Sequence, residues 1–222
     1  YMGEIATPSR CGRMDQGCAY GARPVRMVFD GDRVDVEELS VGKDLYFVIV
    51  DLKKAKDTRE ILARLNQSYP FADDDVQKGV QKYLGPISAA ITNQAVEALR
   101  QGDAERLGSL MVHAQAEFDK YCIPACPSQL TSPHLHALLA YEPIQPFIHG
   151  GKGVGSQGDG TAQLLCKDAD CQEKVIEIIE RDLGMSCLKL EVCAGRRIRK
   201  ALIPAAGFGT RLFPATKGLK KE

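Results

Sequence analysis

The sequence predicts an α+β protein in which pairs of helices pack against a few antiparallel strands. Short apolar or alternating runs, typical of strands, lie at residues 45–50, 162–166 and 187–192. Two long helical patterns lie between the first two of these runs, at 87–101 and 104–121. This combination of helix pairs and separate strands favours the α+β class.

A β-hairpin is expected over residues 24–39, around the turn Asp30-Gly31-Asp32. Apolar residues alternate on both sides of that turn, which is a hairpin signal. These residues are Val25, Met27, Phe29, Val34 and Val36. The next strand, 45–50, is a continuous apolar run bounded by charges, which predicts burial on both faces.

Helices are expected to follow that strand. Asp57 can cap the first of them, and the Glu60 side chain can reach back to complete a capping box. The apolar stripe of this helix consists of Ile61, Leu62 and Leu65. Apolar residues then repeat at every fourth position until Gly102 stops the helix, and they are Ile87, Ile91, Ala95 and Leu99. Asp103 caps the next helix, so these two helices should form an antiparallel hairpin.

The remaining elements are shorter. A short helix is expected around 135–139, followed by a glycine-rich loop from His149 to Gly160. After the strand at 162–166, a helix should run from Glu173 to Leu183 and stop at Gly184, before the last strand. A domain boundary is placed at Gly195, ahead of a basic segment.

The composition gives no indication of a nucleic-acid or membrane partner. Lys plus Arg and Asp plus Glu both number 29, so the net charge is zero. No apolar run approaches the roughly 20 residues that cross a bilayer, and the first residues lack a signal-peptide pattern. The eight cysteines are scattered, which predicts reduced thiols in a cytoplasmic protein. No metal site is expected, since neither the cysteines nor the four histidines have zinc-site spacing, although a C-x₃-C pair is not fully excluded.

The segment from Ser9 to Gln16 carries a candidate catalytic carboxylate, Asp15. A carboxylate suits a kinase because it can accept or orient the proton of an attacking hydroxyl. The neighbouring charges of Arg10 and Arg13 would keep it ionised. From residue types alone, the cap of a short helix is the favoured role of Asp15.

Cys11-Gly12-Arg13-Met14-Asp15-Gln16 resembles the catalytic segment of galactokinase-like (GHMP) sugar kinases. The resemblance implies that Asp15 is the catalytic aspartate, with Gly12 and Gln16 at the substrate or phosphate site. Residues 53–62 and the pattern from Ala98 to Met111 also resemble that family's C-terminal domain. Residues 1–43 would then be the end of the kinase N-domain. Residues 44–195 would be a ferredoxin-like GHMP C-terminal domain with a helix hairpin.

The glycine-rich segment 150–161 is a candidate phosphate or sugar site. Glycines let a backbone approach a phosphate closely, and successive N–H groups can cradle it, but a flexible hairpin connection has the same composition. It is not a Walker A loop. Its position resembles the third GHMP motif, which implies binding roles for Lys152, Gly153, Gly155, Ser156, Gly158 and Gly160. Val154 and Asp159 depart from that motif. Asp159 can bind a sugar hydroxyl, hold Mg²⁺ through water, or fix the loop by local hydrogen bonds, which is the role we expect.

The family's ATP-wrapping loop has no counterpart in this chain. Because that loop and the Mg²⁺ ligands precede the catalytic segment in the family, the preceding kinase portion is expected to be a partner of this chain. The resemblance implies ATP and Mg²⁺ as cofactors of the intact enzyme, and the chain alone is expected to be inactive.

Residues 196–222 form a third part, a linker and the start of another domain. The stretch from Leu202 to Lys217 resembles the opening signature of sugar-1-phosphate nucleotidyltransferases of the UTP–glucose-1-phosphate uridylyltransferase type. The alternative is a linker rich in glycine and proline. The resemblance implies binding of UTP or another NTP, with Arg211 neutralising pyrophosphate charge. The signature residues are Gly207, Gly209, Thr210, Arg211 and Lys217.

The expected function is therefore part of a bifunctional cytoplasmic enzyme of nucleotide-sugar synthesis. An ATP-dependent kinase would phosphorylate a monosaccharide, at the anomeric hydroxyl, and a nucleotidyltransferase would use the sugar 1-phosphate. A non-catalytic, sugar-sensing module derived from such a kinase is the alternative.

Overall fold

The computed structural model describes residues 24–30 and 33–195. These residues form two units, a β-hairpin and a larger unit that begins at Ser40. In the hairpin, β1 (Val25–Asp30) pairs antiparallel with β2 (Arg33–Glu38), in a register that runs from Val25 opposite Glu38 to Asp30 opposite Arg33. The predicted hairpin is confirmed, whereas the division of the chain into three parts stays a prediction.

The larger unit is built on a four-stranded sheet with the order β4-β5-β3-β6. All neighbouring strands are antiparallel. The strands are β3 (Leu45–Asp51), β4 (Ile148–Gly153), β5 (Thr161–Cys166) and β6 (Ser186–Val192). Helices follow the first and third of these strands, which makes a βαββαβ chain order with the first strand beside the last one. This is the ferredoxin-like topology that the sequence predicts.

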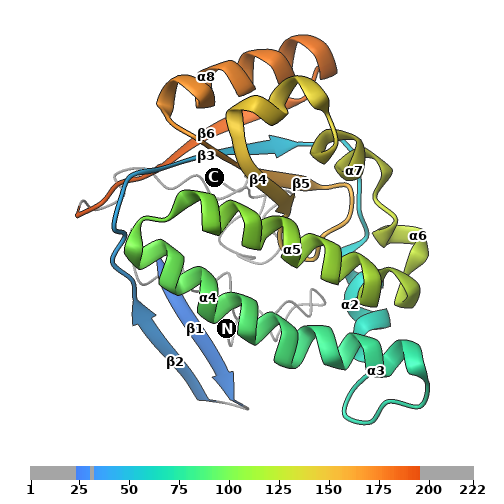
Figure 1. Cartoon of the computed structure of the whole chain (residues 1–222). Coiled ribbons are helices and arrows are strands. Elements are labelled where there is room, and N and C mark those ends of the chain that lie inside the picture. The colour runs from blue at the N-terminus through green and yellow to red at the C-terminus, as the bar shows by residue number, and fades with distance from the viewer. Residues whose placement is uncertain (1–23, 31–32, 196–222) are drawn as a thin grey trace, which may run out of the picture. The chain divides into compact units, whose positions relative to one another are not determined.

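The predicted helix hairpin is also confirmed. α4 (Ser88–Gln101) ends at Gly102, whose φ of 71° only glycine adopts easily. α5 (Ala104–Cys122) begins directly afterwards, and its cap Asp103 accepts a hydrogen bond from the Arg106 amide at 2.9 Å. α4 and α5 lie antiparallel (Figure 1).

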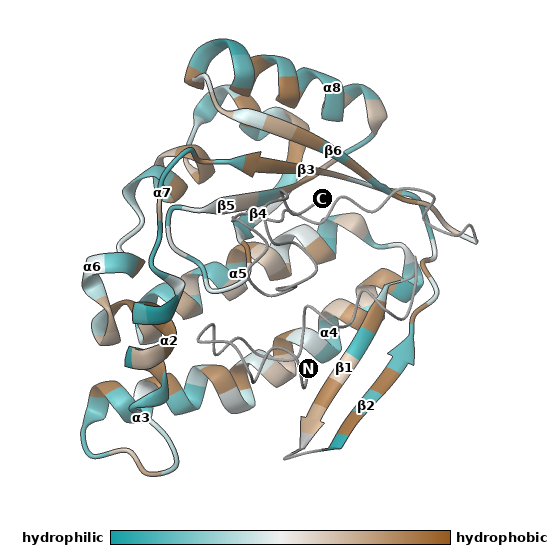
Figure 2. Cartoon of the chain, turned by 180° about the vertical axis from the view of Figure 1, so that it is seen from behind, coloured by the Kyte–Doolittle hydropathy of each residue, from teal (hydrophilic) through white to brown (hydrophobic). Residues whose placement is uncertain are grey.

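Helices cover both faces of the sheet. On one face, Leu45 and Leu165 pack with Leu107, Leu110 and Met111 of α5. On the other face, the fully buried Val48 and Val50 pack with α7 and α8. Figure 1 shows α8 on one side of the sheet and α4 with α5 on the other. Figure 2 shows the apolar colour of β3, which lies between these layers. The prediction that residues 45–50 are buried on both faces is therefore confirmed.

Of the other helices, α2, α3 and α6 pack with the end of α5 in a further apolar cluster. α7 and α8 lie on the face of the sheet opposite α5. Short single turns of 3₁₀- or π-helix extend several of them. The helices are α2 (Thr58–Asn66), α3 (Asp75–Lys82), α6 (Pro127–Leu130), α7 (Pro133–Leu139) and α8 (Ala169–Ile178). The short turns are η2 (Tyr83–Ile87), η3 (Ile123–Ala125), η4 (Glu142–Phe147) and η5 (Ile179–Leu183). No helix among residues 24–30 and 33–195 has the length and apolar character to cross a bilayer.

Two local predictions are wrong. α8 begins at Ala169 rather than Glu173, because Asp168 caps it through the Cys171 amide at 2.7 Å. Asp57 does cap α2, but Glu60 does not reach back to close a capping box. Its carboxylate instead accepts hydrogen bonds from Ser128 at 2.8 Å and Gln129 at 2.9 Å. A tertiary contact with the segment around α6 thus replaces the local one.

Candidate functional site

The structure places the predicted site residues in two groups. The glycine-rich segment, with Lys152, Gly153, Gly155, Ser156, Gly158 and Gly160, lies in the larger unit. The catalytic segment with Gly12, Asp15 and Gln16 lies outside the described residues. So does the nucleotidyltransferase signature with Gly207, Gly209, Thr210, Arg211 and Lys217. The site is therefore built from the glycine-rich segment and its surroundings.

Only the second half of that segment is a loop. Residues 148–153 form the edge strand β4, which corrects the prediction of a loop from His149 onward. Glycine is a poor strand residue unless another backbone approaches closely. Here α5 makes that approach: a Cβ on Gly150 would lie 2.8 Å from the carbonyl carbon of Gly108, and one on Gly108 would lie 2.6 Å from that of His149. Gly150 therefore allows the backbone of α5 to pack directly against β4.

Residues 154–160 form the connection between β4 and β5. The Val154 amide donates to the Thr161 carbonyl at 3.0 Å and closes the loop. Three residues adopt the left-handed conformation, with φ of 63° at Gly155, 64° at Gln157 and 77° at Gly158. Within the described part of the chain, the amides of Gly155, Ser156, Gly158, Asp159 and Gly160 donate to no backbone carbonyl. Amides in such a loop can donate to a phosphate or hydroxyl oxygen.

Lys56 holds the loop from the side of α2. Its ammonium donates to the carbonyl oxygens of Gln157 at 2.8 Å and Val154 at 3.3 Å. Its aliphatic stem runs beside two glycines, since a Cβ on Gly160 would lie 2.9 Å from Lys56 Cε and one on Gly158 would lie 3.3 Å from Cδ. Burial lowers the pKa of Lys56. Gly160 and Gly158 thus leave the space that this lysine occupies.

Lys152 supplies a second cation at the base of the loop. Its ammonium donates to the Gly153 carbonyl at 2.7 Å, and among the described residues no carboxylate forms an ion pair with it. Burial lowers its pKa, because the charged form loses water. An anionic ligand would stabilise the charged form of this lysine.

An open pocket lies on the α2 side of the loop. It has a volume of about 540 Å³ and is lined by Ala55, Lys56, Asp57, Thr58, Arg59 and Gln129. The Ser156 hydroxyl of the loop lies 3.4 Å from the Thr58 hydroxyl, on the first residue of α2. Ser156 thus joins the loop to the wall of this pocket with a group that can donate or accept.

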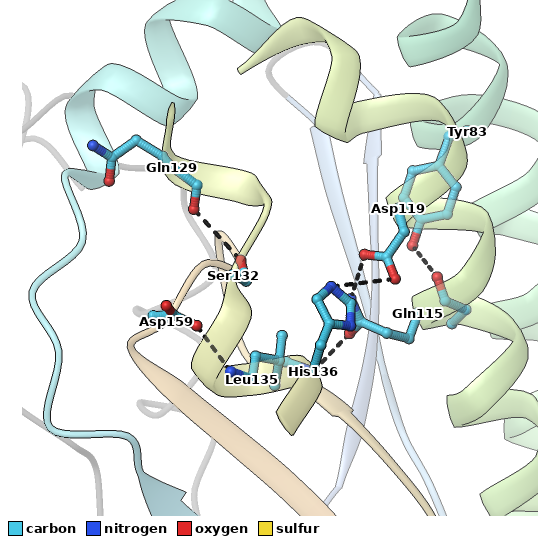
Figure 3. A network of polar contacts seen from close by, with 10 residues as sticks. Tyr83, Gln115, Asp119, Gln129, Ser132, Leu135, His136 and Asp159 are labelled. Carbon is cyan, nitrogen blue, oxygen red and sulfur yellow. Dashed lines mark hydrogen bonds and ion pairs between the residues drawn. The ribbon is translucent and has the colours of Figure 1, made fainter. Parts of the chain in front are cut away.

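Asp159 has a structural role in the described residues. Its carboxylate accepts a hydrogen bond from the Leu135 amide at 2.9 Å, in the first turn of α7 (Figure 3). The residue at the N-terminus of α7, Ser132, makes no capping bond with its side chain. The predicted hydrogen-bonding role of Asp159 is confirmed, but its partner is 24 residues away rather than local.

Replacing Asp159 by alanine should lower the free energy of unfolding by about 1 kcal/mol, the usual effect of losing a helix cap. Asp159→Asn keeps an oxygen acceptor of the same length and should retain most of this stability. Urea unfolding of both variants measures the difference. Equal midpoints for Asp159→Ala and the unchanged protein would contradict a capping role.

The predicted absence of a metal site stays a prediction. Among residues 24–30 and 33–195, no three His, Cys, Asp or Glu side chains are grouped so as to hold a metal ion. His149 lies on β4 against α5, and burial, with the charge of Lys167 adding to it, lowers its pKa.

Two residues of the site, Lys56 and Gln115, are not predicted from the sequence. The Gln115 carboxamide accepts a hydrogen bond from the Gly153 amide at 2.8 Å, at the start of the loop. No local pattern marks either residue, since Lys56 follows other lysines and Gln115 interrupts an apolar helix stripe. The one available signal is that Gln115 is a polar residue within a buried stripe.

The fold is shared with several solved kinase structures. The mevalonate kinase of L. major in complex with R-mevalonate is 18% identical, over 77% of this chain and 49% of that one, with a TM-score of 0.58. Lactococcus lactis galactokinase complexed with galactose is 15% identical over 80% and 52%, with a TM-score of 0.51. Homoserine kinase from Cytophaga hutchinsonii is 16% identical over 81% and 50%, with a TM-score of 0.51. At these identities the likeness concerns the fold alone, which this chain shares with these three kinases.

Sequence comparison with curated proteins finds only short matches. UTP–glucose-1-phosphate uridylyltransferase of Mycoplasma pneumoniae is 73% identical over 26 residues, which is 12% of this chain and 9% of that protein. UTP–glucose-1-phosphate uridylyltransferase 2 of Staphylococcus saprophyticus is 67% identical over 27 residues, again 9% of that protein. No family model matches the chain. The chain thus spans about half of the kinase structures and under a tenth of these uridylyltransferases.

Proposed function

We propose that this chain is part of an ATP-dependent sugar kinase of the GHMP type, which phosphorylates a monosaccharide at its anomeric hydroxyl. The observation that carries the proposal is the loop 154–160, which starts beside the cation Lys152. Five of its seven backbone amides donate to no backbone carbonyl of the described residues. The loop stands on a ferredoxin-like domain with the fold of GHMP-type kinases. The resemblance of the Asp15 segment to the catalytic segment of such kinases supports the same reading.

In this proposal each residue has a separate task. The Asp15 carboxylate accepts or orients the proton of the sugar hydroxyl, which makes the hydroxyl oxygen a better nucleophile. Lys152 and the amides of Gly155, Ser156, Gly158 and Gly160 bind the oxygen atoms of phosphate or sugar. Gly12 and Gln16 lie beside Asp15 in sequence and complete the sugar side. ATP, together with Mg²⁺, supplies the transferred phosphoryl group when it is bound.

A second activity is proposed for the segment 196–222. Its Gly207–Lys217 signature resembles that of nucleotidyltransferases, and the short matches to two uridylyltransferases are of about the same length as this segment. We propose that it begins a domain that uses UTP or another NTP. The product of the kinase, a sugar 1-phosphate, would be its substrate.

The kinase proposal is tested with the full-length protein that carries this chain. It is mixed with ATP, Mg²⁺ and one free sugar at a time, and ADP release is followed. We expect release above the sugar-free rate with at least one sugar, and a sugar 1-phosphate as its product. Tight sugar binding without ADP release from any sugar would favour the non-catalytic sensing module instead.

A further inference from the structure

The loop 154–160 is tied to two helices by a chain of polar contacts that runs through the protein (Figure 3). One end of this chain lies at Gly153, where β4 ends and the loop starts. The other lies at Asp159, near the end of the loop. Three polar side chains lead from Gly153 to α7, namely Gln115 and Asp119 of α5 and His136 of α7 itself.

The first contact is a hydrogen bond to a backbone amide at the unpaired edge of β4. β4 is an edge strand, and the Val154 amide already points to β5, so the Gly153 amide points away from the sheet. Gln115 Oε1 accepts from this amide at 2.8 Å. Gln115 is only 5% exposed, so the bond lies in a dry environment in which an unpaired amide would be costly.

The same glutamine is connected to α7 through the Asp119 side chain. Gln115 Nε2 donates to Asp119 Oδ1 at 2.8 Å, and Asp119 Oδ2 lies 3.7 Å from His136 Nε2. His136 follows Leu135, whose amide donates to Asp159 at 2.9 Å. The loop, α5 and α7 are thereby joined in one circuit, which the peptide bond between Leu135 and His136 completes.

We propose that Gln115, Asp119 and His136 are positioning residues that hold both ends of the loop 154–160 in its ligand-binding conformation. The part of this inference that concerns ligand binding rests on the proposed kinase function. A loop that is already ordered loses less conformational entropy when it binds a phosphate or sugar oxygen. Loss of the circuit should therefore weaken ligand binding more than it slows the reaction of the bound ligand.

Gln115→Leu removes both hydrogen bonds of the glutamine at similar side-chain size. Gln94→Leu is the matched control, because Gln94 is an exposed glutamine of the neighbouring helix α4. The double variant Gln115→Glu, Asp119→Asn is the rescue. Its new carboxylate can accept from the Gly153 amide, and its new carboxamide can donate to that carboxylate.

The first measurement is hydrogen–deuterium exchange of peptides that cover 153–160, on the full-length protein without ligand. We expect exchange there to be about tenfold faster in Gln115→Leu, and unchanged in Gln94→Leu and in the double variant. Unchanged loop exchange in Gln115→Leu would overturn the proposal. So would an acceleration that is uniform over the chain, because it would report only a loss of global stability. If Gln115→Leu does not fold, Asp159→Ala at the other end of the circuit takes its place.

The second measurement is the split between KM and kcat, with the sugar that gives ADP release. We expect KM to rise about fivefold or more in Gln115→Leu, with kcat changed less than twofold and both values restored in the double variant. A fall in kcat at constant KM would contradict positioning for binding. If no sugar gives ADP release in the unchanged protein, the kinase function fails, while the exchange data still decide whether the circuit orders the loop.

Discussion

Replacing Asp15 by alanine in the full-length protein is expected to reduce ADP release by roughly 10²–10⁴-fold, the usual contribution of a general base. The carboxylate is proposed to take the proton of the sugar hydroxyl as its oxygen attacks the γ-phosphate, and alanine has no group that can do so. Sugar affinity should remain largely intact, since binding uses other groups. ADP release and calorimetric titration of the sugar measure the two effects separately.

Asp15→Asn sharpens this test because asparagine has nearly the same size but accepts protons poorly. It should lose turnover to a similar extent as Asp15→Ala. Asp170→Asn is a suitable control, since Asp170 is an exposed carboxylate in the first turn of α8. Unchanged turnover in Asp15→Ala would remove this residue from the mechanism.

Gly150→Ala is expected to lower the free energy of unfolding by about 1–3 kcal/mol, as overpacking does in a close-packed interior. The added methyl group would meet backbone atoms of Gly108, including the carbonyl carbon at 2.8 Å, and a backbone cannot rotate away as a flexible side chain can. α5 would have to move off β4. The measurement is the urea midpoint at constant slope.

Gly85→Ala is the matched control for this prediction. Gly85 lies in η2, and a Cβ there would meet no atom within 4 Å apart from its chain neighbours and its own helix. Alanine should change the free energy of unfolding by less than about 1 kcal/mol, because the gain from replacing a helical glycine is offset by crowding against the ring of Pro86. A midpoint for Gly150→Ala as high as that for Gly85→Ala would show that β4 and α5 do not approach so closely.

The two glycine predictions illustrate why the glycine-rich segment was only partly predictable. Its composition indicates a loop, and the turn at 155–158 is indeed built on left-handed residues. Gly150 serves a different purpose, because it leaves room for Gly108, which is 42 residues earlier in the chain. A single sequence contains no signal that pairs these two glycines, so the strand β4 was read as loop.

For Asp159 too, the sequence predicts one part of its role and tertiary packing decides the other. Its residue type predicts hydrogen bonding to backbone amides near a turn, and it does bond to an amide. That amide belongs to Leu135 in α7, so the bond fixes a helix to the loop rather than the loop to itself. The chemistry of the side chain was predictable and its partner was not.

Element types and many of their ends follow from neighbours in the chain. Asp57, Asp103 and Gly102 cap helices as expected, and the run at 45–50 is a strand buried on both faces. These features are local because caps, stripes and apolar runs involve residues at most a few positions apart. The surroundings of the loop 154–160 depend on packing instead. Lys56, just before α2, bonds to Gln157, which is 101 residues further along the chain. Gln115 of α5 bonds to Gly153, which is 38 residues further along. Such contacts exist only once the sheet has brought these segments together.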